Sequence, residues 1–578
     1  MAVPVQTDGP LALNGPVTGV GIEKSGRSTL TLGAANDFSS SVTLTEGILE
    51  SAAAGALAAD ELRQLGGVVK FTAPETLGTT YRVTTGAATD FATIRTESDV
   101  VLPDFDLVQG KLIKRGTGRL EIPFGNSDSP QFYTGGPYPN PRDPNEVVLP
   151  NDGSAPYLKS TGAAFDLGGL TVAEGELVLS GAASNTTVSC PGPRIIVGLR
   201  TKDCAAQPRL QFKDINLGFD YNANLYVGIS ANKDDVPPAG YEPTFAMDNA
   251  SSSFDYIIIG SFCYGKFSHP TVTLTNSVLN STRTVKLSQA NGFSNGSSAR
   301  WFVKDSKVTC GNATTGGSGF TWYGGLEFDF DHSTMERKDG TCAPLAGMEE
   351  KYTYGTMAFR NGSVFGVNSL AASGVTHDCT VSFDDSTWRT DASLTLSSAN
   401  ASPTYFHVRS VGDGLKVNAA QGTTFSFSEI PLTGDGGITS TGAGTVAFGA
   451  GMYQATGAIR AEAGVIDFSN AGTVSGATVA GGAGTISGAN FSGLTISLDS
   501  WDPTSVPLFD GCTFAGRTSV SFAGDAPADD LQGILVARYT GATPSTEGWR
   551  IPRKGGSFTA ANGEIRVSTH SGLVLVVR

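Results

Sequence analysis

Apolar and polar residues alternate along short segments of this chain, and glycine-centred turns separate the segments. The stretch 24–50 contains two of them, TLTL starting at Thr29 and VTLTEGIL starting at Val42, joined by a small polar turn. Alternation with a period of two residues is typical of β-strands that bury one face. The pattern therefore predicts an all-β protein built from short strands.

The same two-part phrase returns twice further along the chain. Its first half begins at Lys24, Lys114 and Ser440. In register, the copies share two glycine columns, which are Gly26, Gly116 and Gly442, and Gly47, Gly175 and Gly464. These glycines are 21 and 22 residues apart in the outer copies and 59 apart in the middle copy. A period near twenty residues predicts a β-solenoid whose coils stack to bury their apolar faces, with an insertion in the middle copy.

The phrase K-x-G-x-G-x-L-x-L, followed by a polar turn and V-x-V-x-x-G-x-L, resembles the autotransporter-associated β-strand repeat. That repeat occurs in large secreted and surface proteins of Gram-negative bacteria. The resemblance covers roughly residues 24–50, 112–181 and 438–468, about a quarter of the chain. It implies a right-handed parallel β-helix that is exported to the cell surface or beyond, and it carries over no catalytic residues.

Changes in composition and in strand pattern along the sequence predict four segments. They are N-terminal coils over 1–185 with a proline-rich loop insertion at about 125–161, larger decorated coils over 186–432, regular Gly- and Ala-rich coils over 433–500, and a capping segment over 501–578. Proline cannot donate to a strand ladder, which is why the insertion is predicted as a loop. The alanine-rich stretch 51–62 is compatible with a short helix or with a coil corner.

A column of Asp and Asn residues follows the apolar strand ends of the central segment. Its members are Asp214, Asp248, Asn276, Asp305, Asp331, Asn361 and Asp385, at intervals of 24 to 34 residues. Asp and Asn tolerate the left-handed backbone conformation and bond to nearby backbone groups. The column therefore predicts one recurrent corner, so that the β-helix continues through this segment.

Composition limits the partners of the protein. The chain carries 39 Lys and Arg against 54 Asp and Glu, a formal net charge of −15, which argues against nucleic acid as a ligand. The sequence contains no run of eighteen apolar residues, so no membrane span is predicted. The first residues lack the basic and apolar regions of a signal peptide, so the predicted extracellular or cell-surface location rests on the resemblance.

Seven cysteines are present, and none forms a close CxxC pair. Cys190 with Cys204, and Cys310 with Cys342, are candidate disulfides that would pin excursions from the coils in an oxidising compartment. The alternative for these residues is buried free thiols. Because the count is odd, at least one cysteine stays free or pairs between chains.

The run LEFDFD contains the strongest candidates for chemistry. Alternation places Glu327, Asp329 and Asp331 on one face of a strand. Three carboxylates in a row could hold a calcium ion as cofactor, or they could act as acid and base as in sugar-cleaving β-helices. The alternative is an ordinary outward acidic face. Asp384, Asp385 and Asp413 faintly resemble the carboxylates of polygalacturonase-like hydrolases, but the accompanying GHG and RIK motifs are absent.

Tyrosines in the proline-rich insertion are candidates for binding. Tyr133, Tyr138 and Tyr157 could stack on sugar rings if the loop exposes them, or could anchor a flap that covers its own coils. The leading hypothesis is a non-enzymatic extracellular structural or adhesive β-helix. Its loops would contact a glycan, a surface, or further copies of the chain head to tail. The alternative hypothesis is a polysaccharide lyase or glycoside hydrolase of the β-helix type.

Overall fold

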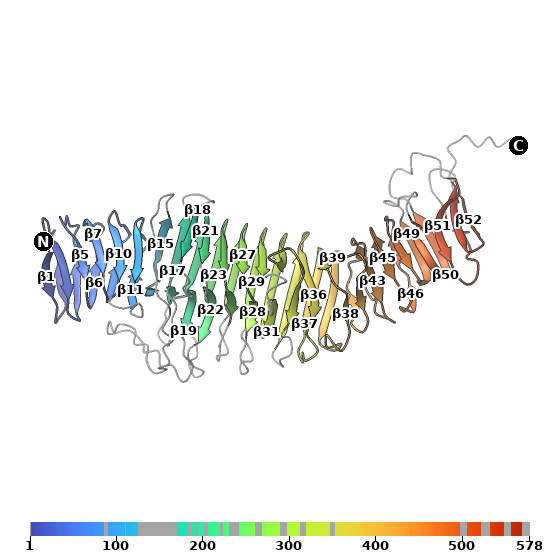
Figure 1. The fold of residues 1–578 in the computed structure, drawn as a ribbon, viewed down its shortest axis with the longest axis horizontal. Coiled ribbons are helices and arrows are strands. Elements are labelled where there is room, and N and C mark those ends of the chain that lie inside the picture. Colours follow the sequence, from blue (N-terminus) through green and yellow to red (C-terminus); the bar gives the residue numbers. More distant parts are fainter. Residues whose placement is uncertain are drawn as a thin grey trace. The chain divides into compact units, whose positions relative to one another are not determined.

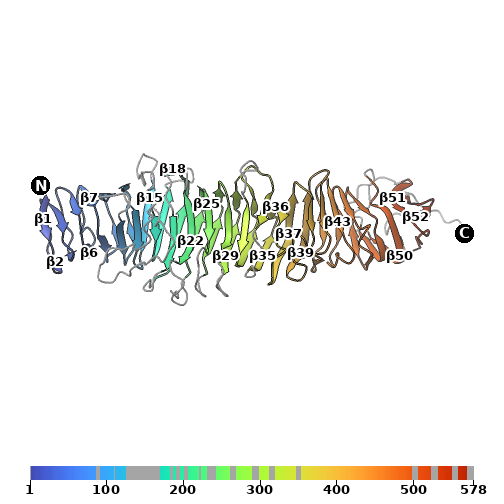
Figure 2. The same ribbon diagram turned by 60° about the horizontal axis from the view of Figure 1, so that its bottom comes forward.

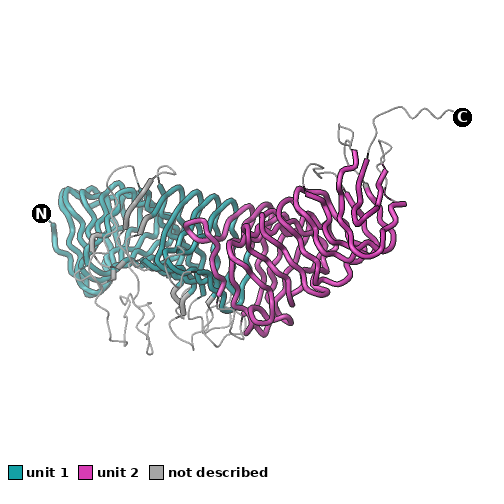
Figure 3. The backbone as a smooth tube through the Cα atoms, turned by 45° about the vertical axis from the view of Figure 1, so that its right-hand side comes forward, with its two compact units in different colours: residues 1–328 teal, residues 329–578 magenta. Residues whose placement is uncertain are grey.

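A computed structural model of the protein describes most of the chain. The described residues are 2–85, 91–109, 111–124, 170–181, 186–190, 195–200, 206–219, 223–230, 242–260, 269–289, 298–311, 319–346, 353–497, 506–521, 532–547, 549 and 557–568. All regular elements among them are β-strands, and no helix is long and apolar enough to cross a membrane. The chain divides into two compact units, 1–328 and 329–578 (Figure 3).

Strands of unit 1 pair in parallel with the strand one coil further on, and not with their neighbour in the sequence (Figure 1). One face is a six-stranded sheet of β1 (Ala2–Gln6), β3 (Gly21–Ser25), β5 (Val42–Leu44), β7 (Glu61–Gln64), β10 (Thr80–Thr84) and β13 (Phe105–Gln109). A second face stacks β2 (Leu11–Leu13), β4 (Thr29–Leu32), β6 (Ile48–Ser51), β8 (Val68–Phe71), β11 (Phe91–Thr96) and β14 (Lys111–Arg115). This arrangement confirms the predicted parallel β-helix.

The period-two alternation fills the interior of the coils. In β4, Leu30 and Leu32 are fully buried, while Thr29 and Thr31 between them are half-buried. Leu30 pairs in register with Leu49 of β6, and Leu49 pairs with Val69 of β8. Each such side chain contributes about 1.5–3 kcal/mol of hydrophobic stabilisation. A one-residue slip would turn the whole column outward, so the apolar pattern fixes the register.

Glycines form the corners between β3 and β4 and between the equivalent strands of the next coils. Gly26, Gly47 and Gly67 have φ values of 79°, 77° and 70°, in the left-handed region. A Cβ at Gly47 would lie 2.3 Å from the carbonyl oxygen of Gly26, and a Cβ at Gly67 would lie 2.4 Å from that of Gly47. The two glycine columns predicted from the sequence are therefore one column, because each half of the repeat phrase is a coil by itself.

The second copy of the phrase builds the same corner. Gly116 lies between β14 and β15 (Arg119–Phe124), and Gly175 lies between β16 (Leu170–Val172) and β17 (Glu176–Gly181). β14 pairs with β16 and β15 with β17, so these segments also belong to consecutive coils. The predicted insertion at about 125–161 falls between β15 and β16 and lies outside the described residues.

Non-glycine residues take over the left-handed corner in the central coils. Five of the seven predicted positions have positive φ, and two corners lie one residue later than predicted, at Asn249 instead of Asp248 and at His332 instead of Asp331. The confirmed positions are Asp214, Asn276, Asp305, Asn361 and Asp385, with φ between 46° and 54°. The shift arises because Asp248 is still the last residue of β23 (Thr244–Asp248) and pairs with the next coil.

Side chains at these corners bond from coil to coil. In unit 1, Asn249 Nδ2 donates to Asp214 Oδ1 at 2.8 Å, and Asn276 Nδ2 donates to Asn249 Oδ1 at 3.1 Å. A buried serine follows: Ser277 Oγ donates to the carbonyl oxygen of Thr275 at 2.6 Å, and Ser306 Oγ accepts the backbone N–H of Ser277 at 3.0 Å. These bonds satisfy polar groups that the turn would otherwise leave buried and unpaired.

Unit 2 has the same parallel pairing with an aromatic interior. β35 (Tyr354–Arg360), β37 (Cys379–Thr390) and β39 (Phe406–Ala419) lie side by side (Figure 2). Ring centroids of Phe427 and Phe448 are 4.9 Å apart and stacked, and Phe468 continues the stack at 4.9 Å from Phe448. Stacked rings at this spacing add to the stabilisation from buried area.

The parallel order changes in the last described strands. β51 (Ile534–Tyr539) pairs in parallel with β50 (Phe509–Ser521), whereas β53 (Glu564–Ser568) runs antiparallel to both β51 and β52 (Ser557–Ala561). Trp549 packs edge-on between Phe514 of β50 and Phe558 of β52. This antiparallel hairpin lies within 501–578, the segment that the sequence predicts as a cap. The alanine-rich stretch 51–62 forms turns and then β7, so the corner interpretation holds and the helix does not.

We expect Gly47→Ala to destabilise unit 1 strongly. The left-handed conformation alone costs an alanine about 1–2 kcal/mol, and the backbone contact at the Cβ position adds to that cost. Gly78→Ala is the matched control, since Gly78 has no positive φ and no atom within 4 Å of its Cβ position. Urea unfolding of the two variants measures the difference. Equal midpoints for both would show that the stacked glycine corner is not what the coil requires.

Candidate functional site

The predicted acidic strand is β32 (Gly325–Asp331), on which the division between the two units falls. Phe328 and Phe330 point into the interior and are buried, while Glu327 is exposed and Asp329 and Asp331 are half-buried. The alternation predicted from the sequence is therefore confirmed. The three carboxylates lie on the outward face of one strand.

Arginines of neighbouring strands pair with each of these carboxylates. In unit 1, Arg300 Nε lies 3.3 Å from Glu327 Oε2. In unit 2, Arg360 Nη2 donates to Asp329 Oδ2, and Arg360 Nε lies 4.0 Å from Asp331 Oδ2. The pairs occupy carboxylate oxygens that a substrate would have to reach. They connect adjacent coils, which is the role of an ordinary outward face.

Asp331 has a further partner that joins it to the corner. Asn361 Nδ2 donates to Asp331 Oδ1 at 2.6 Å, and Asn361 is itself one of the left-handed corner residues. The bond resembles the one between Asn249 and Asp214 in unit 1. Asp331 therefore supports the next corner although its own φ is not positive.

The second predicted carboxylate group builds a bulge between β37 and β39. Asp384 Oδ1 accepts the backbone N–H of Asp413 at 3.0 Å, and Lys416 Nζ donates to Asp385 Oδ1. The register shifts at this point, because residues 412–414 of β39 loop out opposite Asp385. All three carboxyl-bearing residues thus lie at one corner, where Asp384 holds the bulged backbone and Asp385 pairs with a lysine of β39.

Metal binding and the tyrosine site receive no support from the described residues. They contain no group of three or more His, Cys, Asp or Glu side chains placed to hold a metal ion, and calcium stays a prediction. Tyr133, Tyr138 and Tyr157 lie outside the described residues, so the binding prediction on them is not tested.

The predicted Cys310–Cys342 disulfide is corrected by the structure. Neither residue forms a disulfide, and both thiols are fully buried. Cys310 ends β30 (Lys307–Cys310), and Cys342 Sγ lies 3.3 Å from the carbonyl oxygen of Arg389. Each thiol packs inside a coil as a small apolar group, the alternative considered from the sequence. For the other candidate pair, Cys190 lies at the end of β18 (Thr186–Cys190), and Cys204 lies outside the described residues.

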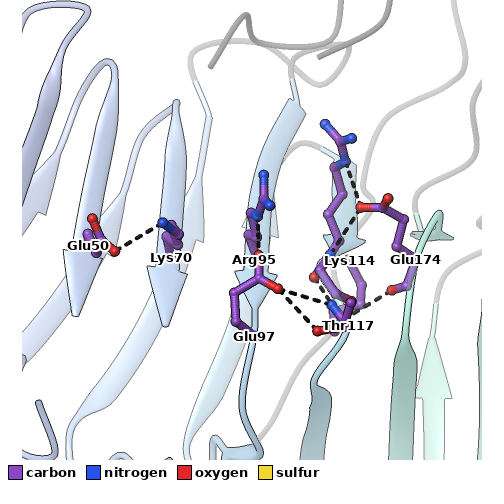
Figure 4. A network of polar contacts seen from close by, with 9 residues as sticks. Glu50, Lys70, Arg95, Glu97, Lys114, Thr117 and Glu174 are labelled. Atoms are coloured by element: carbon purple, nitrogen blue, oxygen red, sulfur yellow. Dashed lines mark hydrogen bonds and ion pairs between the residues drawn. The ribbon is translucent and has the colours of Figure 1, made fainter. Parts of the chain in front are cut away.

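A buried lysine, Lys114, belongs to a network of polar contacts in unit 1 (Figure 4). Lys114 is fully buried, and its Nζ donates to the carbonyl oxygens of Arg115, Gly116 and Glu174 at 2.8, 3.0 and 3.1 Å. The carboxylate of Glu174 accepts the N–H of Gly116 at 3.2 Å and lies 3.4 Å from Arg115 Nε. The ammonium group therefore saturates the carbonyls that the glycine corner turns inward.

Further polar pairs lie on this coil and on the coils before it. Glu97 Oε2 accepts the backbone N–H of Thr117 at 3.4 Å and its hydroxyl at 3.2 Å, and Arg95 Nε donates to Glu97 Oε1. Lys70 Nζ donates to Glu50 Oε1 at 3.0 Å (Figure 4). These contacts connect consecutive coils and leave their charges neutralised.

The first copy of the repeat has the same arrangement. Lys24 is fully buried, and its Nζ donates to the carbonyl oxygens of Ser25, Gly26 and Glu46 at 2.8, 2.6 and 3.0 Å. In the third copy, a buried Ser440 occupies the lysine position, and its Oγ donates to the carbonyl oxygen of Ala463 at 2.9 Å. The lysine column was visible in the aligned sequence, but alternation alone assigned it no role.

Burial governs the titration of both lysines. It lowers the pKa of Lys114 to about 7, against the opposing effect of nearby carboxylates, first of all Glu174. Burial also lowers the pKa of Lys24, against the opposing charge of Glu46. A perturbed lysine in a cleft would suggest a nucleophile or base. Lys114 has no exposed surface and three backbone acceptors, so its role is to hold the corner.

Comparisons with protein-family models, with characterised proteins and with solved structures find no match to this chain. The site is therefore interpreted from its geometry.

We expect the Lys114 amine to titrate near neutral pH in the folded protein. Its ordinary pKa is about 10.4, so between pH 7 and about 10 the unfolded chain binds more protons than the folded one. Stability contributed by this group then rises with pH across that window and is smallest below pH 7. Carbon NMR of the lysine Cε, assigned by comparison with Lys114→Met, follows the titration directly. A Cε signal that stays at its ammonium position up to pH 9 would contradict the prediction.

Proposed function

We propose that this protein is a non-enzymatic extracellular or cell-surface β-helix with a structural or adhesive role. The observation that carries the proposal is the use of its charged side chains. Glu327, Asp329 and Asp331, the candidates for acid–base chemistry, are paired with arginines of adjacent strands. The stacked glycine corners and the phrase beginning at Lys24 also support kinship with autotransporter-associated repeats, which occur in exported proteins.

Contact with a glycan is favoured over head-to-tail self-assembly as the form of this role. Stacking of copies would require a coil-shaped end that accepts a further parallel strand. In unit 2, the hairpin of β52 and β53 covers β51 and reverses the strand direction. A glycan, in contrast, can lie along the outer face of the coils without an open end.

A polysaccharide lyase or hydrolase remains the alternative to test. We expect no release of reducing ends or unsaturated sugars from polygalacturonate, alginate or hyaluronate, because the candidate carboxylates are engaged with Arg300 and Arg360. Asp329→Asn and Arg360→Ala are measured beside the unaltered protein. Release by the unaltered protein that Asp329→Asn abolishes would establish the enzyme and overturn the proposal.

Location is tested on intact cells of the source organism. We expect brief protease treatment of the cells to release peptides of this protein while a cytoplasmic marker stays protected. Detection of the protein only after lysis would contradict the proposed surface or extracellular role, whatever the glycan experiments show.

A further inference from the structure

Four adjacent strands of unit 1 present a flat outer face. They are β20 (Arg209–Lys213), β23 (Thr244–Asp248), β26 (Thr271–Thr275) and β29 (Ser298–Lys304), paired in parallel without a register shift. Every second residue points outward, which gives three columns, and we call this surface the β20–β29 face. The columns are Arg209, Thr244, Thr271 and Arg300; Gln211, Ala246, Thr273 and Phe302; and Lys213, Asp248, Thr275 and Lys304.

An exposed aromatic ring lies in the middle column. Phe302 is 40% exposed, and it is the only aromatic residue among the exposed large hydrophobic residues of the described chain. On the same strand face, Arg300 precedes it by two residues and Lys304 follows it by two, each about 7 Å away along the strand. Its neighbours Trp301 and Val303 are buried in the interior, so the Phe302 ring is not needed to fill the core.

The two lysines of this face differ from the paired cations elsewhere in unit 1. Lys70, Arg82 and Arg119 each form ion pairs with carboxylates of their own or neighbouring strands. Within the described residues, Lys213 and Lys304 form no ion pair and no side-chain hydrogen bond. Both are exposed. Two exposed lysines without a partner stand out in a protein of net charge −15.

Hydrogen-bonding groups between these lysines are also available. Among the described residues, the Thr273 and Thr275 hydroxyls and the Gln211 amide have no side-chain hydrogen bond. Arg300, in contrast, is fixed by two carboxylates. Its Nη1 donates to Glu242 Oε1 at 3.2 Å, and its Nε lies 3.3 Å from Glu327 Oε2. Arg209 is paired as well, since its Nε lies 3.0 Å from Glu176 Oε1. The face therefore combines two paired arginines, two exposed lysines, the half-buried carboxylate of Asp248, free polar groups and an exposed ring.

We propose that the β20–β29 face binds an acidic polysaccharide, a chain of pyranose rings that carry carboxylates. This inference rests on the proposed adhesive function and names the ligand class and the surface. One sugar ring stacks on Phe302 through its apolar face. A carboxylate of that ring or the next one pairs with Lys304. With strands about 4.8 Å apart, Lys213 lies about 14 Å from Lys304 along the helix, within reach of a following sugar.

Binding of polygalacturonate to the full chain, measured by affinity electrophoresis, tests the inference. We expect retardation by polygalacturonate and none by neutral dextran, with the effect weakened by salt because exposed charges are screened. Phe302→Ala and Lys304→Ala should each weaken binding about tenfold. Phe302→Trp should retain it, because the larger ring keeps the stacking surface.

Two matched variants control for loss of apolar surface and of charge. Leu65→Ala removes a side chain of similar exposure, 39%, and Arg27→Ala removes an exposed cation, both in unit 1 and outside the β20–β29 face. Both should bind within about twofold of the unaltered protein. Thermal unfolding of all variants verifies that the exposed substitutions leave the fold intact.

The outcomes separate the surface from the function. Binding that Phe302→Ala and Lys304→Ala leave unchanged would overturn the assignment of this face, while the adhesive function would stand. Equal binding of dextran and polygalacturonate would overturn the acidic class of ligand. No binding of polygalacturonate, alginate or hyaluronate would overturn the inference as a whole. The protease treatment of intact cells decides the proposed function independently.

Discussion

The corner is the constraint on which these coils depend. At each corner the backbone turns through a left-handed conformation while the next coil stacks directly above it. In the first coils only glycine fits, since a Cβ at Gly47 would lie 2.3 Å from a carbonyl oxygen of the preceding coil. In the central coils Asp, Asn and His adopt the same conformation at φ between 46° and 54°, where their side chains have room to bond with the next corner.

A corner also turns carbonyl groups inward, and the chain satisfies them with side chains from inside the coil. Lys24 and Lys114 each donate to three carbonyl oxygens, and Ser440 performs the same task with one hydroxyl. Most outward charges pair from strand to strand. The carboxylates on β32 belong to this framework. On the β20–β29 face, Lys213 and Lys304 form no such pair. We therefore place the ligand at Phe302 and its neighbours.

Alternation and glycine spacing were sufficient to predict the coils of the β-helix and the outward direction of the β32 carboxylates, and the column of Asp and Asn residues predicted five of seven central corners. The errors at Asp248 and Asp331 have one cause: the last residue of a strand is fixed by its partner in the next coil, which a local pattern does not contain. The prediction of a disulfide between Cys310 and Cys342 was wrong, because sequence spacing does not show which thiols lie inside a coil. The burial of Lys114 could not be predicted either, because the groups that accept its hydrogen bonds are backbone carbonyls, which no residue type marks in the sequence.

In unit 1, Lys24 and Lys114 hold corners, whereas we propose that the exposed Lys213 and Lys304 meet a ligand. Reductive methylation of the native protein, read by mass spectrometry with and without polygalacturonate, tests this distinction most directly. We expect Lys24 and Lys114 to stay unmodified because they are buried, and Lys213 and Lys304 to react rapidly and to be protected by the polysaccharide. Rapid modification of Lys114, or equal modification of Lys304 with and without polygalacturonate, would contradict it.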